Sequence, residues 1–205
     1  MKNFNLILTI LVYYFHILIA ASSDPVFGEN GMIVSTSKQA SEAGIEILKK
    51  GGNAVDAAVA VGFALAVTSS SNGNIGGGGF MVAAMTDGET FTLDYREKAP
   101  AAAHRDLFLN DSGNVVPGMS LFSRAGSGVP GTVDGLIRAL ADHGSGNITL
   151  RQALAPAIRL AEKGFELSHY EARRFNGYEG LFQSNDAAAA AIIVAVLFIF
   201  ELWIV

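Results

Sequence analysis

Residues 73–100 contain four consecutive glycines and then two apolar-rich runs, and they read Gly73-Asn-Ile-Gly-Gly-Gly-Gly-Phe-Met-Val-Ala-Ala-Met-Thr-Asp-Gly-Glu-Thr-Phe-Thr-Leu-Asp-Tyr-Arg-Glu-Lys-Ala-Pro100. Asp87-Gly88 lies between the two runs, and this pattern is typical of a β-hairpin because glycine supplies the positive φ that a tight turn needs. The sequence therefore predicts antiparallel strands over Phe80–Thr86 and Thr90–Tyr95, with a two-residue turn at Asp87-Gly88.

The glycines at 76–79 precede the first predicted strand. Phosphate-binding loops have the opposite order, because the glycines there follow a strand and open a helix whose amino end faces the anion. No Lys-Ser or Lys-Thr follows these glycines either. Because glycine has no side chain, the run indicates a place where another backbone or a ligand approaches closely. Arg96 stands where the second strand ends.

The amino terminus has the features of a secretory signal peptide. Lys2 precedes Phe4–Ile19, which contains no charged residue, and the small residues Ala20-Ala-Ser-Ser23 follow. We expect a leader over residues 1–22 and an exported protein, extracellular or periplasmic. An uncleaved signal anchor that associates with the membrane is the alternative, although the apolar run is short for a span.

Composition excludes several classes of protein. The 205 residues, less leader and tail, leave about 165 for a single core of ordinary size. A net charge of −5 with no basic stretch argues against a nucleic-acid partner. There is no cysteine, and the four histidines show no metal-binding spacing. We therefore expect neither a metal nor a cofactor.

Capping signals predict a series of helices after a short strand at Met32–Ser35. Ser37 should cap a helix that ends near Lys50. Asn53 should cap a helix over Ala54–Val67, with Asp56 in its first turn as a capping residue. That helix is apolar on every side, which indicates that protein encloses it.

The second half of the chain begins with a long irregular loop over residues 100–130. Pro130-Gly-Thr should then open a helix that ends near His143. Thr149 and Gln152 form a capping box for a helix over Leu150–Lys163, which Pro156 should kink or restart. Ser168 and Glu171 repeat the capping signature.

The tail over residues 186–205 differs in character from the rest. Fourteen uncharged residues precede Glu201, which is short for a membrane span. Two interpretations remain open: a membrane segment, or non-native read-through of the gene.

Five ordered blocks resemble the amino-terminal part of the γ-glutamyltransferases, also called glutathione hydrolases. The blocks are Gly51-Gly-Asn-Ala-Val-Asp-Ala-Ala, Gly73-Asn-Ile-Gly-Gly-Gly-Gly-Phe-Met, Leu93-Asp-Tyr-Arg-Glu-Lys-Ala-Pro, Gly128-Val-Pro-Gly-Thr-Val and Ala155-Pro-Ala-Ile-Arg-Leu-Ala. The resemblance implies an α/β fold, specifically part of the α/β/β/α sandwich of an amino-terminal-nucleophile hydrolase, with residues 24–183 as a large-subunit portion.

In that family one precursor cleaves itself into a large and a small subunit, and the threonine that begins the small subunit attacks the γ-glutamyl amide. The partners implied are glutathione or other γ-glutamyl compounds and the small subunit. Arg96, within Asp94-Tyr-Arg-Glu, matches the arginine that holds the α-carboxylate of the γ-glutamyl group. A planar guanidinium suits this role because it can form two parallel hydrogen bonds to a carboxylate.

The resemblance ends near Gln183, ahead of any threonine nucleophile, and the last threonine, Thr149, has the position of a helix cap. The family also usually carries a Pro or His and a Gly-Ile pair ahead of the glycines, where this chain has Thr68–Ile75. We expect a large-subunit portion truncated before its nucleophile, with no catalytic residue in this chain. An exported or tail-anchored protein that binds γ-glutamyl compounds without chemistry is the alternative.

We predict that the purified 205-residue chain does not hydrolyse γ-glutamyl compounds, because acyl transfer needs an activated nucleophile and Arg96 can only orient the substrate. Release of the chromophore from a γ-glutamyl anilide measures this. Turnover that survives repurification and is lost in Arg96→Ala would contradict the prediction.

Overall fold

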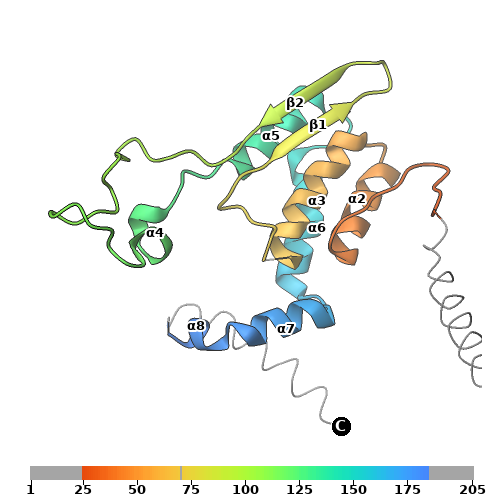
Figure 1. Ribbon diagram of the computed structural model, residues 1–205. Coiled ribbons are helices and arrows are strands. Elements are labelled where there is room, and N and C mark those ends of the chain that lie inside the picture. Colours follow the sequence, from red (N-terminus) through yellow and green to blue (C-terminus); the bar gives the residue numbers. More distant parts are fainter. Residues whose placement is uncertain (1–24, 70, 185–205) are drawn as a thin grey trace, which may run out of the picture. The chain divides into compact units, whose positions relative to one another are not determined.

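The computed structural model describes residues 25–69 and 71–184 (Figure 1). The predicted leader and the apolar tail therefore lie outside the described residues. The chain divides into an amino-terminal unit that ends at Met32 and a main unit that begins at Ile33. Residues 25–32 of the first unit contain no helix or strand.

The main unit is a mixture of helices and one hairpin. Its elements are α2 (Lys38–Lys49), α3 (Ala54–Thr68), β1 (Phe80–Ala84), β2 (Thr90–Asp94), α4 (Met119–Phe122), the 3-10 helix η1 (Arg124–Gly126), α5 (Thr132–His143), α6 (Leu150–Lys163), α7 (His169–Gly177) and α8 (Glu179–Gln183).

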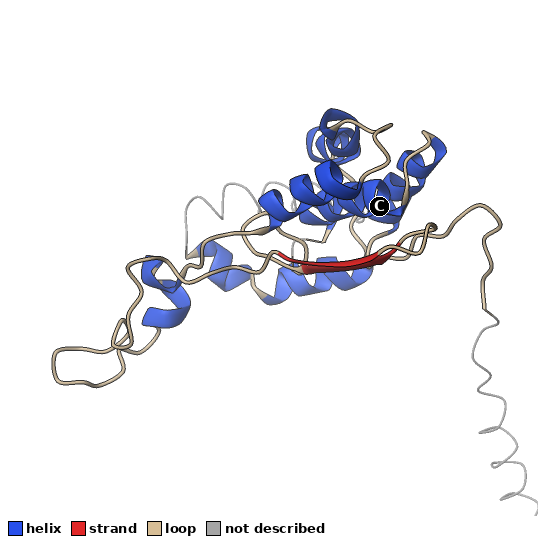
Figure 2. Ribbon diagram, turned by 90° about the horizontal axis from the view of Figure 1, so that it is seen from above, coloured by secondary structure: helices blue, strands red, loops and turns tan. Residues whose placement is uncertain are grey.

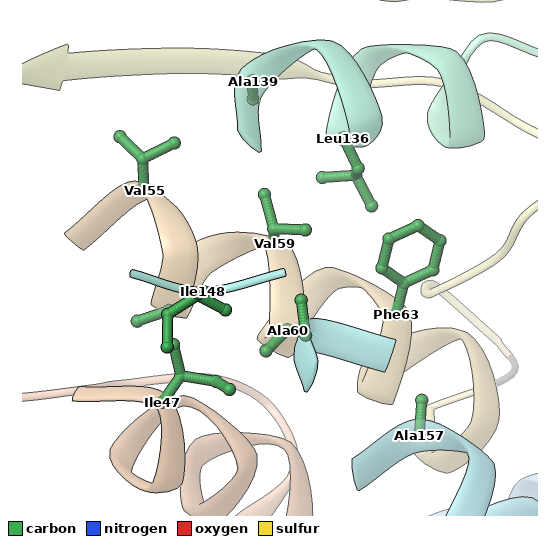
Figure 3. Packing of buried hydrophobic residues seen from close by; sticks show 11 residues of the cluster. Ile47, Val55, Val59, Ala60, Phe63, Leu136, Ala139, Ile148 and Ala157 are labelled. Carbon is green, nitrogen blue, oxygen red and sulfur yellow. The ribbon is translucent and has the colours of Figure 1, made fainter. Parts of the chain in front are cut away.

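Helix α3 forms the centre of the core. It packs against α2, α5 and α6. Val59 and Phe63 of α3 lie opposite Leu136 of α5, and Ile47 of α2 lies on the other side (Figure 3). The prediction that protein encloses this apolar helix is confirmed, because contacts from three other helices cover its several faces.

The predicted capping residues occupy their expected places. Ser37, Asn53, Thr149 and Ser168 each accept a hydrogen bond from a main-chain N–H in the first turn of their helix. Asp56 is fully buried, and its Oδ2 accepts hydrogen bonds from the N–H groups of Asn53 (2.8 Å) and Ser145 (3.0 Å). Its capping role is confirmed, and it also ties the start of α3 to the loop after α5.

The predicted hairpin is present, with Phe80 opposite Asp94 and Ala84 opposite Thr90 in register. Its turn differs from the prediction. The N–H of Met85 donates to the carbonyl of Glu89 (2.8 Å), so Thr86, Asp87 and Gly88 form a three-residue loop. Gly88 takes the left-handed conformation at φ +91°, which suits the last position of such loops.

The predicted strand at Met32–Ser35 is wrong. The backbone there has no ladder partner among the described residues, and the side chain of Val34 is 84% exposed. A strand needs a neighbour to complete its hydrogen bonds, and sequence pattern alone does not supply one. A smaller difference is the presence of the short helices α4 and η1 within the predicted loop. Helix α6 runs through Pro156 without a restart.

The hairpin has one covered and one open face (Figures 1 and 2). Met81, Phe91 and Leu93 pack against the core around α3 and α5. On the other face, the side chains of Phe80 and Val82 are 62% and 81% exposed. The described residues therefore contain one two-stranded sheet with helices on one side, as expected for part of an α/β/β/α sandwich.

A cluster of charges joins α2 to α6. Glu46 forms ion pairs with Lys50 (2.7 Å) on its own helix and with Arg159 on α6. Burial alone would raise the pKa of the Glu46 carboxyl, but the hydrogen bonds and charges of Lys50 and Arg159 outweigh burial and lower this pKa below its ordinary value. The ionised carboxylate therefore stabilises the folded state.

Because the pKa of Glu46 is lowered in the folded protein, its contribution to stability is present above the ordinary value of 4.5 and is lost as the pH falls below it. We predict that Glu46→Gln lowers the free energy of unfolding near pH 7 by up to about 1 kcal/mol, since the pair is partly solvated. In urea titrations, the difference between the variant and the wild-type chain should shrink as the pH falls below 4.5. Glu162→Gln, at an exposed site of α6, should show no such trend.

We also predict that residues 24–183, produced as an isolated protein, self-associate or stay molten, because the open face of the hairpin exposes apolar side chains to water. Light scattering and thermal unfolding measure this. A monomer with a sharp cooperative transition and dispersed amide signals would argue against the prediction.

A pair of matched substitutions distinguishes the effect of the open face of the hairpin on self-association from the effect of the core on stability. Val82→Thr should reduce self-association and leave the unfolding midpoint unchanged, because Val82 is exposed. Val59→Thr should lower the free energy of unfolding by about 1–3 kcal/mol, because a hydroxyl would be buried at a fully buried position.

Candidate functional site

Arg96 lies two residues beyond the end of β2, and its side chain is exposed. Its main-chain N–H donates to Oδ1 of Asp94 at 3.1 Å. Its guanidinium carbon lies 5.7 Å from the centre of the Phe80 ring, which places the positive charge over an aromatic face. No carboxylate among the described residues pairs with this guanidinium, so its five N–H donors can bind an external anion.

The glycine run positions the backbone that carries Arg96. A Cβ at Gly78 would lie only 2.6 Å from the Cα of Arg96 and the nitrogen of Glu97. The next glycine, Gly79, pairs with Tyr95 through main-chain hydrogen bonds, the shorter of them 3.0 Å. The expectation that another backbone approaches these glycines closely is confirmed, and they lead into a strand rather than a helix.

The segment that opens α5 contacts the same place from the other side. The carbonyl of Gly77 accepts hydrogen bonds from the N–H groups of Gly131 (2.8 Å) and Thr132 (3.0 Å). Lys98 and Val129 form an isolated antiparallel bridge. Sequence reasoning identified residues 128–133 only as a helix start and a family block, because these hydrogen bonds join positions about fifty residues apart.

A hollow of about 350 Å³ lies beside Arg96, between the end of β2 and the first turns of α5. Its charged lining consists of Arg96, Lys98, Arg138, Asp94 and Asp134. Arg138 also pairs with a carboxylate one turn along its helix. The hollow is of the size of small-molecule sites, and its cations and carboxylates could bind a ligand that carries both charges.

The described part of the chain contains no group of three or more potential metal-ligating side chains. Within those residues, no helix is long and apolar enough to cross a membrane.

Solved structures with the same fold identify the class of protein. The crystal structure of Helicobacter pylori gamma-glutamyltranspeptidase superposes with a TM-score of 0.76 at 42% identity, over 82% of this chain and 47% of that chain. Gamma-glutamyltranspeptidase from Pseudomonas nitroreducens superposes with a TM-score of 0.72 at 40% identity, over 80% and 48%. The fold is therefore part of an amino-terminal-nucleophile hydrolase, as expected.

Sequence comparison identifies the family. The gamma-glutamyltranspeptidase family model matches residues 40–197, which extends beyond Gln183, where we expected the resemblance to end. Glutathione hydrolase proenzyme of Pseudomonas sp. (strain A14) is 49% identical over 175 residues, and that of Escherichia coli (strain K12) is 50% identical over 141 residues. This chain belongs to the gamma-glutamyltranspeptidase family.

The chain spans only part of these relatives. The matched residues are 85% of this chain but 30% of the Pseudomonas protein, and 69% of this chain but 24% of the Escherichia coli protein.

The glycine contacts predict a difference between neighbouring positions. Gly78→Ala should lower the free energy of unfolding by about 1–3 kcal/mol, because the new methyl group would meet the main chain of Arg96, which cannot rotate away. Gly76→Ala should change it by less than about 0.5 kcal/mol, because no atom lies within 4 Å of a Cβ at that position. Urea unfolding of the two variants compares them, and equal effects would contradict the contact.

Proposed function

We propose that this chain is the large-subunit portion of a γ-glutamyltransferase, or glutathione hydrolase, and that Arg96 holds the α-carboxylate of the γ-glutamyl group. The observation that carries the proposal is the exposed guanidinium of Arg96, which has no carboxylate partner among the described residues and lies over the Phe80 ring on the open face of the hairpin. The similarity to proteins named glutathione hydrolase supports it.

Arg96 contributes to the reaction by orientation. Two parallel N–H donors of the guanidinium can bind both oxygens of a carboxylate, which fixes the plane of the glutamyl group as well as its position. The Phe80 ring below and the Asp94 hydrogen bond to the Arg96 N–H hold the residue in place. A carboxylate clamped at this end directs the γ-amide toward the nucleophile, and such positioning converts binding free energy into rate.

The reaction that we propose is transfer of the γ-glutamyl group from glutathione or a related compound to water, an amino acid or a peptide. The nucleophile would be the amino-terminal threonine of a small subunit, which attacks the amide carbonyl while its own α-amine takes the proton. The open face of the hairpin, with Phe80 and Val82 exposed, supports the need for such a partner.

We further propose that the protein is exported, on the strength of the leader predicted over residues 1–22. Membrane association through the leader or through residues 186–205 rests on sequence alone, since both segments lie outside the described residues. The net charge of −5 is consistent with a small-molecule substrate rather than nucleic acid.

A chimera tests the proposed role of Arg96. Residues 33–183 of this chain would replace the matching segment of the Escherichia coli proenzyme, to which 141 residues are 50% identical. We predict that the chimera hydrolyses a γ-glutamyl anilide and that Arg96→Ala lowers kcat/KM by about 100-fold or more, since two charge-assisted hydrogen bonds are lost. Arg96→Lys should be intermediate, because an ammonium cannot form the parallel pair.

The matched control is Arg105→Ala, because the Arg105 side chain is 97% exposed and lies in the loop after the hairpin. This variant should keep the chimera's activity. A chimera that is processed and active but indifferent to Arg96→Ala would refute the proposed clamp.

A further inference from the structure

The ring of Tyr95 lies against two glycines from different elements. A Cβ at Gly79, beside β1, would be 2.8 Å from the ring atom Cε2 of Tyr95. A Cβ at Gly135, in the first half of α5, would overlap the Cβ and Cγ atoms of Tyr95. Both glycines thus leave room for this ring, and its burial raises the pKa of the phenol.

Glycine in the interior of a helix is less favourable than alanine, so Gly135 needs a local reason. The Tyr95 ring supplies one, because alanine at 135 would displace it. The hydroxyl of Tyr95 forms no hydrogen bond with any described residue. The ring of Tyr95 therefore fits the space beside Gly79 and Gly135 by its shape, and its hydroxyl takes no part in this contact.

The direction of the Tyr95 side chain is linked to that of Arg96, because the two residues are consecutive in an extended segment. Consecutive side chains of an extended chain point to opposite faces, so a ring held on the α5 side sends the next side chain to the other side. The structure shows this arrangement: Tyr95 lies against Gly135, and Arg96 lies over Phe80, whose strand position faces Asp94. Strand β2 ends at Asp94, and the main-chain hydrogen bonds between Gly79 and Tyr95 extend the pairing by one residue, so Arg96 is the first residue beyond the ladder.

We propose that Tyr95, whose ring packs against Gly79 and Gly135, is a positioning residue that fixes the direction of the Arg96 side chain. The inference rests on the proposed function for its consequence, which is that a carboxylate is bound in one orientation. The dependence of the Arg96 direction on the Tyr95 ring does not rely on the proposed function, and it can be measured without a substrate.

The test uses NMR on the chimera with the Escherichia coli proenzyme, labelled selectively at arginine, because residues 24–183 alone are expected to self-associate. Arg96 lies over the Phe80 ring, so its side-chain protons should be shifted upfield by the ring current, and Phe80→Leu should abolish this shift and assign it. Tyr95→Phe should keep the shift, because the ring remains. Tyr95→Ala should lose it.

Two further variants separate positioning from stability. Gly135→Ala should lower the unfolding midpoint and lose the shift, because the methyl group displaces the ring. In the double variant Tyr95→Ala/Gly135→Ala the clash is gone and α5 carries a better helix former, so the midpoint should recover relative to Gly135→Ala. The Arg96 shift should stay lost, which a purely structural role of Tyr95 would not require.

Persistence of the shift in Tyr95→Ala, its absence in the unsubstituted chimera, or its return in the double variant would each overturn the proposal. Titration with glutamate tests the proposed function independently, by following the Arg96 Nε–H signal. If the signal responds in the unsubstituted chimera and in Tyr95→Phe, the apparent Kd should rise about 10-fold or more in Tyr95→Ala. An intact ring-current shift without any response to glutamate would count against the proposed carboxylate clamp and leave the positioning role standing.

Discussion

Close contact between three backbone segments at the end of the hairpin is the constraint on which the site depends. Gly78 lies against the main chain of Arg96, and the carbonyl of Gly77 binds the first N–H groups of α5. A side chain at Gly78 or Gly131 would collide with backbone atoms, which cannot move aside as a flexible side chain can. The absence of side chains is therefore what brings a charged residue, a helix start and a strand end to one place.

Packing in the core of the main unit holds the segments of that contact in place. Helix α3 is held between α2, α5 and α6, and α5 in turn contacts β2. Asp56 joins the start of α3 to the loop that follows α5, with hydrogen bonds at both ends. The position of α5 relative to the hairpin, and thus the lining of the hollow beside Arg96, follows from this packing.

The open face of the hairpin links the fold to the proposed function. Phe80 and Val82 are exposed on the same face as Arg96, so the apolar surface and the proposed carboxylate site are adjacent. A second layer of protein over this face would bury the apolar side chains and enclose the guanidinium at once. Lower exposure to water would in turn strengthen the interaction of Arg96 with a carboxylate.

Arg96 became the candidate site through the resemblance of Asp94-Tyr-Arg-Glu to a family motif. The sequence by itself determined the features that depend on near neighbours: the four helix caps, the hairpin with its partner runs, and the glycine run as a close approach. These follow from φ preferences and from hydrogen bonds spanning a few residues. Only the tertiary structure decided that Met32–Ser35 has no strand partner within the described part of the chain and that Tyr95 meets Gly135. Both depend on segments distant in sequence, because strand pairing and side-chain packing are decided by the elements that come together in the fold.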